Sequence, residues 1–408
     1  MQTLYDRIGA CVDDLTLLGD AGVTEIRGLA HFLRRHPRAR SRWAVVLRRD
    51  VTGDAGSRWT AGDWATALRD LADAGRGQAR FYADTEGLAR LYGEMSGLPV
   101  GLLPVPVVPR PRRSPKPAFQ AIYLGDARDE KGFPVLAQAI LTMEAARRAG
   151  AITFTIQSHF NTEPGDPATV LARAALQEAG PGVHMLGEAL DTDAYGALLG
   201  SADLVLTPYD PIAYQVRSSG VMSEALAAGA PVLVTAGSWM ASQIQPAEQA
   251  HLAALRDRLS PLPVESGSVA LSGLTVGDRV LVELAGPAGP DGVDVRLVFE
   301  GSAGRRVVRV RRDFQTGHLL LLLRPQPGET VMRSDSVLDL ARAWHVPATI
   351  PASAVGVIID YHPEGVREGV AEIAAFREHY RDTAAASSWA RTHSGQALVE
   401  RLAADFKS

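Results

Sequence analysis

Two segments of the chain place cations, small residues and a carboxylate in an order that suits binding of a phosphorylated ligand. In the first, Gly125–Gly132 (GDARDEKG), Arg128 and Lys131 stand just before a helical pattern. The N-terminus of a helix binds anions because its amides are free and its dipole is positive there, and the two cations would add to that attraction. The same residues also fit a solvated loop of mixed charge that caps the helix, so both interpretations stay open.

The second segment, Tyr214–Val221 (YQVRSSGV), opens a short helix. Ser219, Gly220 and Val221 would present amide donors there, and the glycine would let an anion approach closely. We expect Glu224 on the first turn of this helix, where its carboxylate accepts hydrogen bonds from ligand hydroxyls such as those of a ribose. Alternatively, Glu224 only complements the helix dipole. Further pocket candidates, from these loops and from the loop after 183–187, are Gly125, Gly187, Glu188, Arg217 and Ser218.

The elements around these loops alternate between strand and helix from Ala118 onward. Strand patterns cover 118–125, 151–156, 183–187, 203–209 and 231–235, and helical patterns cover 132–150, 168–179, 193–200 and 221–228. Such an alternation forms a parallel, doubly wound sheet, which binds ligands at the carboxyl ends of its strands. We therefore predict that Gly125–Lys131 and Arg217–Gly220 lie beside one cleft.

The flanking regions have other patterns. Helical patterns cover 15–35, 64–74 and 87–96, a strand pattern covers 42–47, and a proline-rich linker covers 104–117. Five short β-type runs between Val269 and Pro325 predict a compact, mostly antiparallel unit, and a strand at 355–360 and helices at 363–381 and 383–406 follow. The predicted domains are a partial α/β domain (1–103), the linker (104–117), a ligand-binding α/β domain (118–255 plus 350–382), an inserted β-rich domain (260–345) and a C-terminal helix (383–408).

The composition argues against several classes of protein. The 42 Lys and Arg against 46 Asp and Glu give a net charge of −4, without the basic excess expected of a nucleic-acid binder. The single cysteine, Cys11, allows no internal disulfide and fits a reducing compartment. No apolar run reaches the roughly 20 residues that span a bilayer, and the N-terminus lacks the pattern of a signal peptide. We predict a cytoplasmic protein, with peripheral contact to the inner membrane left open.

Residues 118–250 resemble the donor half of retaining GT-B glycosyltransferases of family 4, the sucrose-synthase and mannosyltransferase-like group. Ser219-Gly220, Glu224-Ala-Leu-Ala227 and Gly229-Ala-Pro231-Val232 match the family signature S-G-x-x-x-E-A-x-A-x-G-x-P-V. Ala202 to Pro208 resembles its A-D-x-x-x-x-P strand, and Gly125 to Gly132 resembles its G-R-x-x-x-K-G loop. The resemblance predicts a GT-B-like fold of doubly wound parallel-sheet domains, with the β-rich unit inserted in the C-terminal domain.

The resemblance also implies a function and roles for the candidates. A hexosyltransferase would move a sugar, with retention, from a nucleotide-diphosphate sugar to a glycan, lipid-linked or protein acceptor, as in polysaccharide biosynthesis. The diphosphate would lie against Arg128, Lys131, Ser219, Gly220 and Val221, and the ribose against Glu224. Neither the resemblance nor the residues supply a catalytic nucleophile, and no metal or cofactor is expected. The alternative is a non-catalytic relative that holds a nucleotide or glycan as a scaffold.

Three departures from the family pattern keep that alternative open. Position 216 is valine, where the family has the first of two acids spaced eight apart and uses it to contact the transferred sugar. About 105 residues precede the linker, and we expect them to lack the first strand of a full acceptor half. The β-rich stretch near 260–345 is an insertion.

Two further features need an interpretation. Asp191-Thr-Asp193 has the D-x-D form of metal-dependent GT-A transferases, yet it precedes a helical pattern where Asp is a common N-cap. The inserted domain has few aromatic residues for stacking on sugars. Its arginines indicate a solvated strand face or a docking surface for a partner or a second copy; they are Arg305, Arg306, Arg309, Arg311 and Arg312.

Overall fold

The structure is a computed structural model that describes residues 15–36, 41–51, 58–108, 110, 112, 117–158, 166–287, 289–302, 304–314 and 316–406. Cys11 and part of the proline-rich linker lie outside these residues. The chain divides into two compact units, which are described separately below. The first unit comprises Met1–Pro109, Ala213–Ser223 and Ser388–Ser408, and the second comprises Arg110–Ile212 and Glu224–Ser387.

The first unit contains a parallel sheet with the strand order β1-β2-β3-β4. Its strands are β1 (Leu15–Leu18), β2 (Arg42–Leu47), β3 (Ala79–Ala83) and β4 (Val100–Leu102), joined by α2 (Val23–Arg35), α3 (Ala61–Gly75) and α4 (Glu86–Ser96). The prediction of one helix over 15–35 was therefore wrong for its first residues. Leu15–Leu18 pairs in parallel with β2, and the chain turns at Asp20, whose φ is 50°, before the helix begins. β1 is an edge strand of this sheet, and the absence of the first strand of a full acceptor half stays a prediction.

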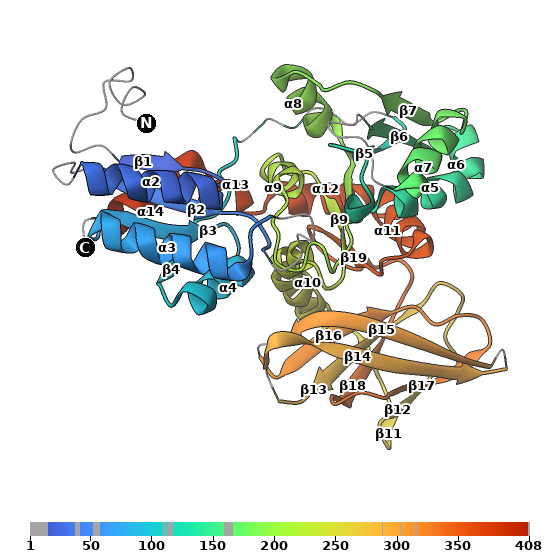
Figure 1. The fold of residues 1–408 in the computed structure, drawn as a ribbon. Helices are drawn as coiled ribbons and strands as arrows, with labels where there is room; N and C mark the ends of the chain where they lie inside the picture. The colour runs from blue at the N-terminus through green and yellow to red at the C-terminus, as the bar shows by residue number, and fades with distance from the viewer. Residues whose placement is uncertain are drawn as a thin grey trace. The chain divides into compact units, whose positions relative to one another are not determined.

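The two faces of this sheet are covered by different parts of the chain (Figure 1). Trp43, Val45 and Leu47 of β2 are buried with the helices α2, α3 and α4. The alternate residues Ala44 and Val46 pack against Leu402 instead.

The prediction of a single helix over 383–406 was wrong, because Ser388 and Ser394 interrupt it. The chain there forms α12 (Arg377–Ala385), α13 (Trp389–Thr392) and α14 (Gly395–Asp405), and Ser394 caps α14.

The second unit contains a six-stranded parallel sheet in the order β19-β9-β8-β5-β6-β7. The chain begins in the middle at β5, builds one edge, and returns to build the other edge from β8, so the predicted doubly wound sheet is confirmed. The strands are β5 (Phe119–Tyr123), β6 (Ile152–Gln157), β7 (Val183–Leu186), β8 (Leu204–Thr207), β9 (Val232–Thr235) and β19 (Gly356–Ile359). The reversal of strand order between β5 and β8 is where ligands bind in sheets of this kind.

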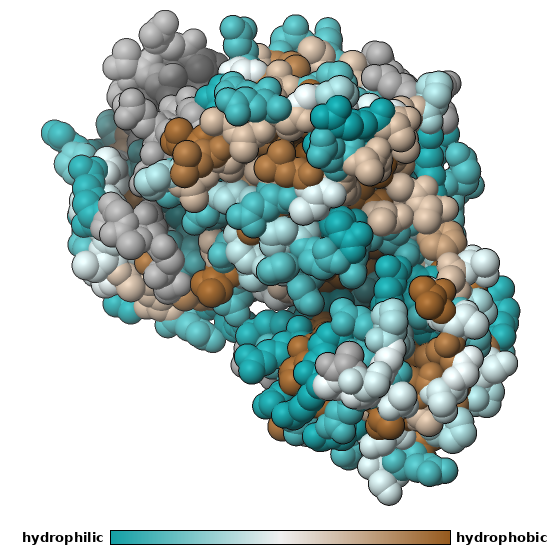
Figure 2. Space-filling model, turned by 90° about the vertical axis from the view of Figure 1, so that its right-hand side faces the viewer, coloured by the Kyte–Doolittle hydropathy of each residue, from teal (hydrophilic) through white to brown (hydrophobic). Residues whose placement is uncertain are grey.

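Helices cover both faces of this sheet. The connections α5 and α7 build the β5-β6-β7 half, and α8 carries the chain back to β8 (Figure 1). The helices are α5 (Phe133–Thr142), α6 (Glu144–Arg148), α7 (Pro167–Gln177), α8 (Thr192–Ser201), α9 (Gly220–Ala227), α10 (Trp239–Arg256) and α11 (Pro363–Ala375). Figure 2 looks onto the side that carries α5 and α7 and shows apolar side chains scattered among polar ones. Over the described residues, no helix is long and apolar enough to cross a membrane.

The segment between α10 and β19 forms two antiparallel sheets, as the all-β prediction for this insertion required. One sheet has the order β10-β18-β13-β16 and the other β11-β12-β17-β14-β15. The strands are β10 (Ser260–Leu262), β11 (Val264–Glu265), β12 (Ser268–Ala270), β13 (Arg279–Ala285), β14 (Gly289–Gly301), β15 (Gly304–Phe314), β16 (His318–Leu323), β17 (Glu329–Ser334) and β18 (Asp339–Val346). Val282, Leu297 and Phe299 lie in the core between the sheets. β17 and β18 were not among the five predicted runs.

The arginines of β15 do not all share one face. Arg305, Arg309 and Arg311 are exposed, as expected for a solvated strand face. Arg306 instead forms two hydrogen bonds with Glu329, of 2.6 and 2.9 Å. Arg312 is buried, with its Nε 3.6 Å from Glu248 of α10. A docking role for this strand stays a prediction.

Candidate functional site

The loop after β5 is tied to the ends of the two neighbouring strands. The amide of Gly125 donates to Gln157 Oε1 over 2.9 Å, and Gln157 Nε2 donates to the carbonyl of Glu188 over 3.4 Å. Gln157 is the last residue of β6 and is buried, and Glu188 follows β7. The predicted loops at Gly125 and at Gly187-Glu188 therefore lie at the same edge of the sheet. Gln157 was not among the predicted site residues.

Lys131 lies against the backbone of this loop. A Cβ at Gly125, whose φ is 105°, would stand 2.8 Å from Lys131 Nζ, so the ammonium occupies the space that a side chain would fill. The same nitrogen lies 5.9 Å from the ring centroid of Tyr209, which follows β8. Lys131 thus places a cation at the carboxyl ends of β5 and β8, where the strand order of the sheet reverses.

Arg128, the second predicted cation, is paired within its own loop. Its Nη1 lies 3.0 Å from Glu130 and its Nε 4.0 Å from Asp126. Its side chain is 35% exposed. A diphosphate would have to compete with these two carboxylates for Arg128.

The loop is packed tightly onto the end of β8. Gly132 has a φ of 65°, and a Cβ there would overlap the carbonyl oxygen of Pro208. The amide of Asp210 also donates to the carbonyl of Glu130 over 3.1 Å. These contacts hold the segment before α5 in one conformation. That segment is a short 3-10 helix, Asp129–Lys131.

Several acidic residues lie close enough to Asp129 for their charges to affect it. Burial raises the pKa of Asp129, and the charges of Asp166 and Asp210 raise it further. The pKa of Tyr361 is raised to about 12 by burial and by Asp210 and Asp129.

Glu224 does not lie on the first turn of α9, contrary to our prediction. The helix begins at Gly220, so Glu224 is its fifth residue, and no acidic residue occupies the first turn. Its carboxylate accepts a hydrogen bond from the hydroxyl of Tyr195 in α8. Burial raises the pKa of Tyr195 well above its usual value, and the bond to Glu224 raises it further. The contact with Tyr195, more than the helix dipole, defines the position of Glu224.

The segment Ala213–Ser223 belongs to the first unit, where Val216 is a packing residue. A Cβ at Gly87 would stand 2.7 Å from Val216 Cγ1, and the carbonyl of Val216 accepts from Thr85 Oγ1 over 2.6 Å. The side chain at the position of the family's first acid therefore contacts α4.

The candidates beside Val216 also have partners within the first unit. Ser218 Oγ donates to Asp84 Oδ2 over 2.6 Å, and that oxygen also accepts from Arg48 over 2.8 Å. The guanidinium carbon of Arg217 lies 4.6 Å from the ring centroid of Tyr214. These contacts fix Arg217 and Ser218 without a ligand.

Ser219, Gly220 and Val221 form the start of α9. Ser219 Oγ accepts from the amide of Met222 over 3.2 Å, so the serine caps the helix. Nothing lies within 4 Å of the position of a Cβ at Gly220, which leaves space for a ligand to approach. These residues belong to the first unit and Lys131 to the second, so the single cleft that we expected stays a prediction.

The D-x-D segment is a helix cap, as we expected. Asp191 is the N-cap of α8, and its Oδ1 accepts from the amide of Ala194 over 2.7 Å. Among the described residues, no group of His, Cys, Asp or Glu side chains has an arrangement suited to a metal ion.

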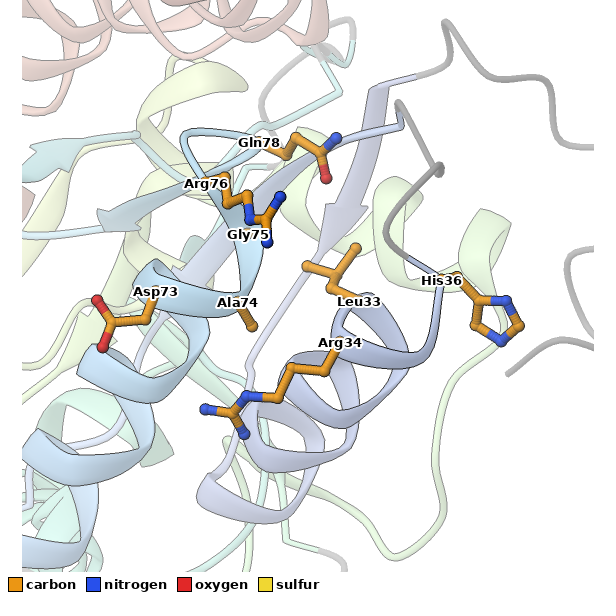
Figure 3. A pocket seen from close by; sticks show the side chains of 8 residues that line it. All are labelled: Leu33, Arg34, His36, Asp73, Ala74, Gly75, Arg76 and Gln78. Carbon is orange, nitrogen blue, oxygen red and sulfur yellow. The ribbon is translucent and has the colours of Figure 1, made fainter.

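Two cavities lie away from these residues. The first, of about 210 Å³, lies where α2 and α3 end, and Figure 3 shows Leu33, Arg34 and Asp73 around it. It is at the edge of the sheet opposite the carboxyl ends of the strands. The second, of about 770 Å³, lies on the face of the β5-β6-β7 half beneath α8 and is lined by Gln120, Thr155 and His184, among others. Neither contains a predicted site residue.

No protein-family model and no curated protein matches the sequence. Among solved structures, the chain is similar to the apo structure of OtsA, at 14% identity and a TM-score of 0.42 over 60% of this chain and 63% of that one. It is also similar to sucrose-phosphate synthase from Thermosynechococcus elongatus, at 14% identity and a TM-score of 0.41 over 61% of each chain. For a UDP-forming trehalose-phosphate synthase from Burkholderia xenovorans the values are 11% and 0.41, over 59% of this chain and 63% of that one. The chain thus spans less than two thirds of the length of these structures.

Proposed function

We propose that this protein transfers a sugar from a nucleotide-diphosphate sugar to an acceptor hydroxyl, and that its second unit holds the nucleotide. One observation carries the proposal. Lys131 Nζ lies 5.9 Å from the ring centroid of Tyr209, which follows β8 at the point where the strand order of the sheet reverses, and in the same unit Tyr195 holds the carboxylate of Glu224. A doubly wound sheet binds its ligands at this point, and the pair of charges suits a diphosphate and the hydroxyls of a ribose.

Lys131 has a direct task in this chemistry. As the bond between sugar and diphosphate breaks, negative charge grows on the leaving nucleoside diphosphate. A fixed cation next to that charge stabilises the transition state more than the ground state, which is the usual largest contribution of such sites. Lys131 is suited to this because its ammonium is held between Gly125 and Tyr209. The start of α9 at Ser219, Gly220 and Val221 would supply further amide donors.

The finer parts of the proposal follow from the family resemblance. The transferred sugar would be a hexose, and the transfer would retain its anomeric configuration without needing a metal ion. The acceptor would be a glycan, a lipid-linked molecule or a protein. Glu224 would bind the ribose. Gly125, Gly187 and Glu188 would line the pocket, since Gln157 links the first and the last of them.

A second candidate function is a non-catalytic protein that holds a nucleotide or a glycan. Two observations favour it. Val216 packs on Gly87 and offers no carboxylate to the sugar, and Arg128 is paired with Asp126 and Glu130. Such a protein would bind the free nucleoside diphosphate as tightly as the nucleotide sugar, whereas an enzyme would also release the diphosphate from its donor.

The test of the proposed function is a binding measurement on a panel of nucleoside diphosphates and their sugars, followed by Lys131→Ala. Calorimetry should show binding by the unaltered protein, and the variant should bind about ten- to a hundred-fold more weakly, since it loses a charge-assisted hydrogen bond. Its melting temperature without ligand should hardly change.

Arg148→Ala is the matched control, because it removes an exposed cation that pairs with Glu144 of the same helix. It should leave the affinity unchanged. Equal affinity in Lys131→Ala and the unaltered protein would show that the loop is a capped turn. If the unaltered protein binds no nucleotide at millimolar concentration, both the sugar transfer and the role as a nucleotide-holding protein are refuted.

A further inference from the structure

We propose that Tyr195 is a positioning residue that holds Glu224 for recognition of a ribose, so that the site prefers ribonucleotides to nucleotides without ribose hydroxyls. This inference rests on the proposed function and adds a specificity-determining residue to it. Tyr195 comes from α8 and Glu224 from α9, and 29 residues separate them in the sequence.

The hydrogen bond between the two side chains has a fixed direction. The tyrosine hydroxyl donates and Glu224 Oε2 accepts. Since burial and the glutamate both raise the pKa of Tyr195, the phenol keeps its proton at every physiological pH. It cannot become an acceptor by ionising, and the carboxylate always has this donor.

The bond leaves the glutamate able to bind a ligand. An ionised carboxylate has two oxygens and about four acceptor positions, of which Tyr195 uses one on Oε2. Oε1 and the remaining lone pair of Oε2 can accept from the two neighbouring hydroxyls of a ribose. A free glutamate side chain would lose rotamer entropy on binding, and the hydrogen bond from the tyrosine already fixes this side chain.

The surroundings of Tyr195 support this arrangement. Gly196, the next residue of α8, has no side chain, and the guanidinium of Arg110 lies against it in the space that a Cβ would fill. The charge of Arg110 acts on Tyr195, as does the hydroxyl of Tyr209. Arg110 therefore places a positive charge beside Tyr195, which favours the approach of an anionic group such as the diphosphate.

The test compares ribose with dideoxyribose. The probes are uridine, guanosine and adenosine diphosphates, and the 2′,3′-dideoxy form of whichever binds the unaltered protein best. We expect the unaltered protein to bind the ribose form about tenfold more tightly or better, since hydrogen bonds to a charged group are lost in the dideoxy form. Tyr195→Phe should reduce this preference by several-fold, mostly through weaker binding of the ribose form.

Tyr380→Phe is the matched control. It removes another buried tyrosine hydroxyl, which lies 3.3 Å from Glu372 in the same unit, and it should keep the full ribose preference. A second comparison does not depend on Tyr195→Phe alone. Glu224→Gln should lose the preference, and adding Tyr195→Phe to it should change nothing more, because the tyrosine acts through the glutamate.

Each other outcome contradicts the inference in a recognisable way. Full ribose preference in Tyr195→Phe, or additive effects of the two substitutions, would overturn the role of Tyr195 and leave the proposed function standing. So would nucleotide binding by the unaltered protein without any ribose preference. If the unaltered protein binds none of the three diphosphates, the proposed function fails, and this inference fails with it.

Discussion

Gly132 determines how closely the candidate diphosphate loop approaches the sheet. Its φ of 65° is in the left-handed region, and the carbonyl oxygen of Pro208 occupies the place of a Cβ. The residue before it, Lys131, has its ammonium beside Gly125. The position of the cation therefore depends on backbone contacts that only glycine allows.

Substitution of Gly132 should show this dependence. Gly150 is a matched control, because its φ is 69° and nothing lies within 4 Å of the position of its Cβ. Gly150→Ala should lower the free energy of unfolding by about 1–2 kcal/mol, the cost of the left-handed conformation. Gly132→Ala should lower it by about 3 kcal/mol or more, because the methyl group also meets Pro208. Equal losses in chemical denaturation would mean that the loop moves away from β8 at little cost.

At the scale of single residues, the sequence predicts features that depend on neighbours along the chain. Gly125, Lys131 and Glu224 were predicted because their types and spacing in loop and helix fit a phosphorylated ligand. The contacts of Gln157 with Gly125 and of Tyr195 with Glu224 were not predicted, because the partners lie 32 and 29 residues apart. Nothing in a strand end or in a helix of small residues indicates which distant group a polar side chain will meet.

Among the elements, α10 joins the parallel sheet to the inserted β sheets. Two of its glutamines bond to strands of the insertion through both ends of the side-chain amide. Gln245 donates to the carbonyl of Asp313 over 2.7 Å and accepts from its amide over 3.0 Å. One turn further on, Gln249 makes the same pair of bonds with Leu320, each of 2.8 Å. Each side-chain amide thereby makes the pair of backbone hydrogen bonds that a neighbouring strand would otherwise make with β15 or β16.

Removal of one of these side chains should loosen the strand it holds. Gln249→Ala leaves the amide and the carbonyl of Leu320 without their partner, which costs about 1–3 kcal/mol when such groups stay buried. We expect the Leu320 amide to exchange with deuterium faster, while the amides of β5 keep their protection. Gln243→Ala, in the same helix, is the control, since that amide bonds to Ser242 of its own helix. Unchanged exchange at Leu320 would show that the helix does not hold β16.

The success of prediction also differed among the elements for physical reasons. The central strands of the parallel sheet are buried on both faces, so they appear as apolar runs between helices, and β5, β8 and β9 were found. β1 has only four residues and lies at an edge with alternate residues exposed, and it merged with the helical pattern after it. The helix α10 was missed; it contains Pro246, which is uncommon inside a helix.

In the whole molecule, neither of the two units is formed by one continuous stretch of the chain. The chain leaves the first unit after Pro109, returns to it for Ala213–Ser223, and returns again at Ser388. No sequence pattern that we recognised marks these returns. The last return is the more extensive, since it brings α14 to the sheet face that α2 and α3 leave uncovered.

The packing of α14 allows the two units to be tested separately. Leu402 is 3% exposed and is packed with Ala44, Val46 and Tyr82, residues that are distant in the sequence. Leu402→Ala should cost about 2–5 kcal/mol, the usual range for a buried leucine. Because the cavity opens beside β2 and β3, their amides should lose protection against deuterium exchange.

The amides of β5 and β8 in the second unit should exchange as before, since Leu402 has no part in that core. Val399→Ala is the matched control on the same helix, because Val399 is 57% exposed and its loss removes little packing. Faster exchange confined to the first unit would establish that the C-terminal helix completes a unit begun more than 300 residues earlier. Equal loss of protection in β2 and β5 would mean that the two units unfold together, and no change in β2 would mean that the helix does not cover this sheet in solution.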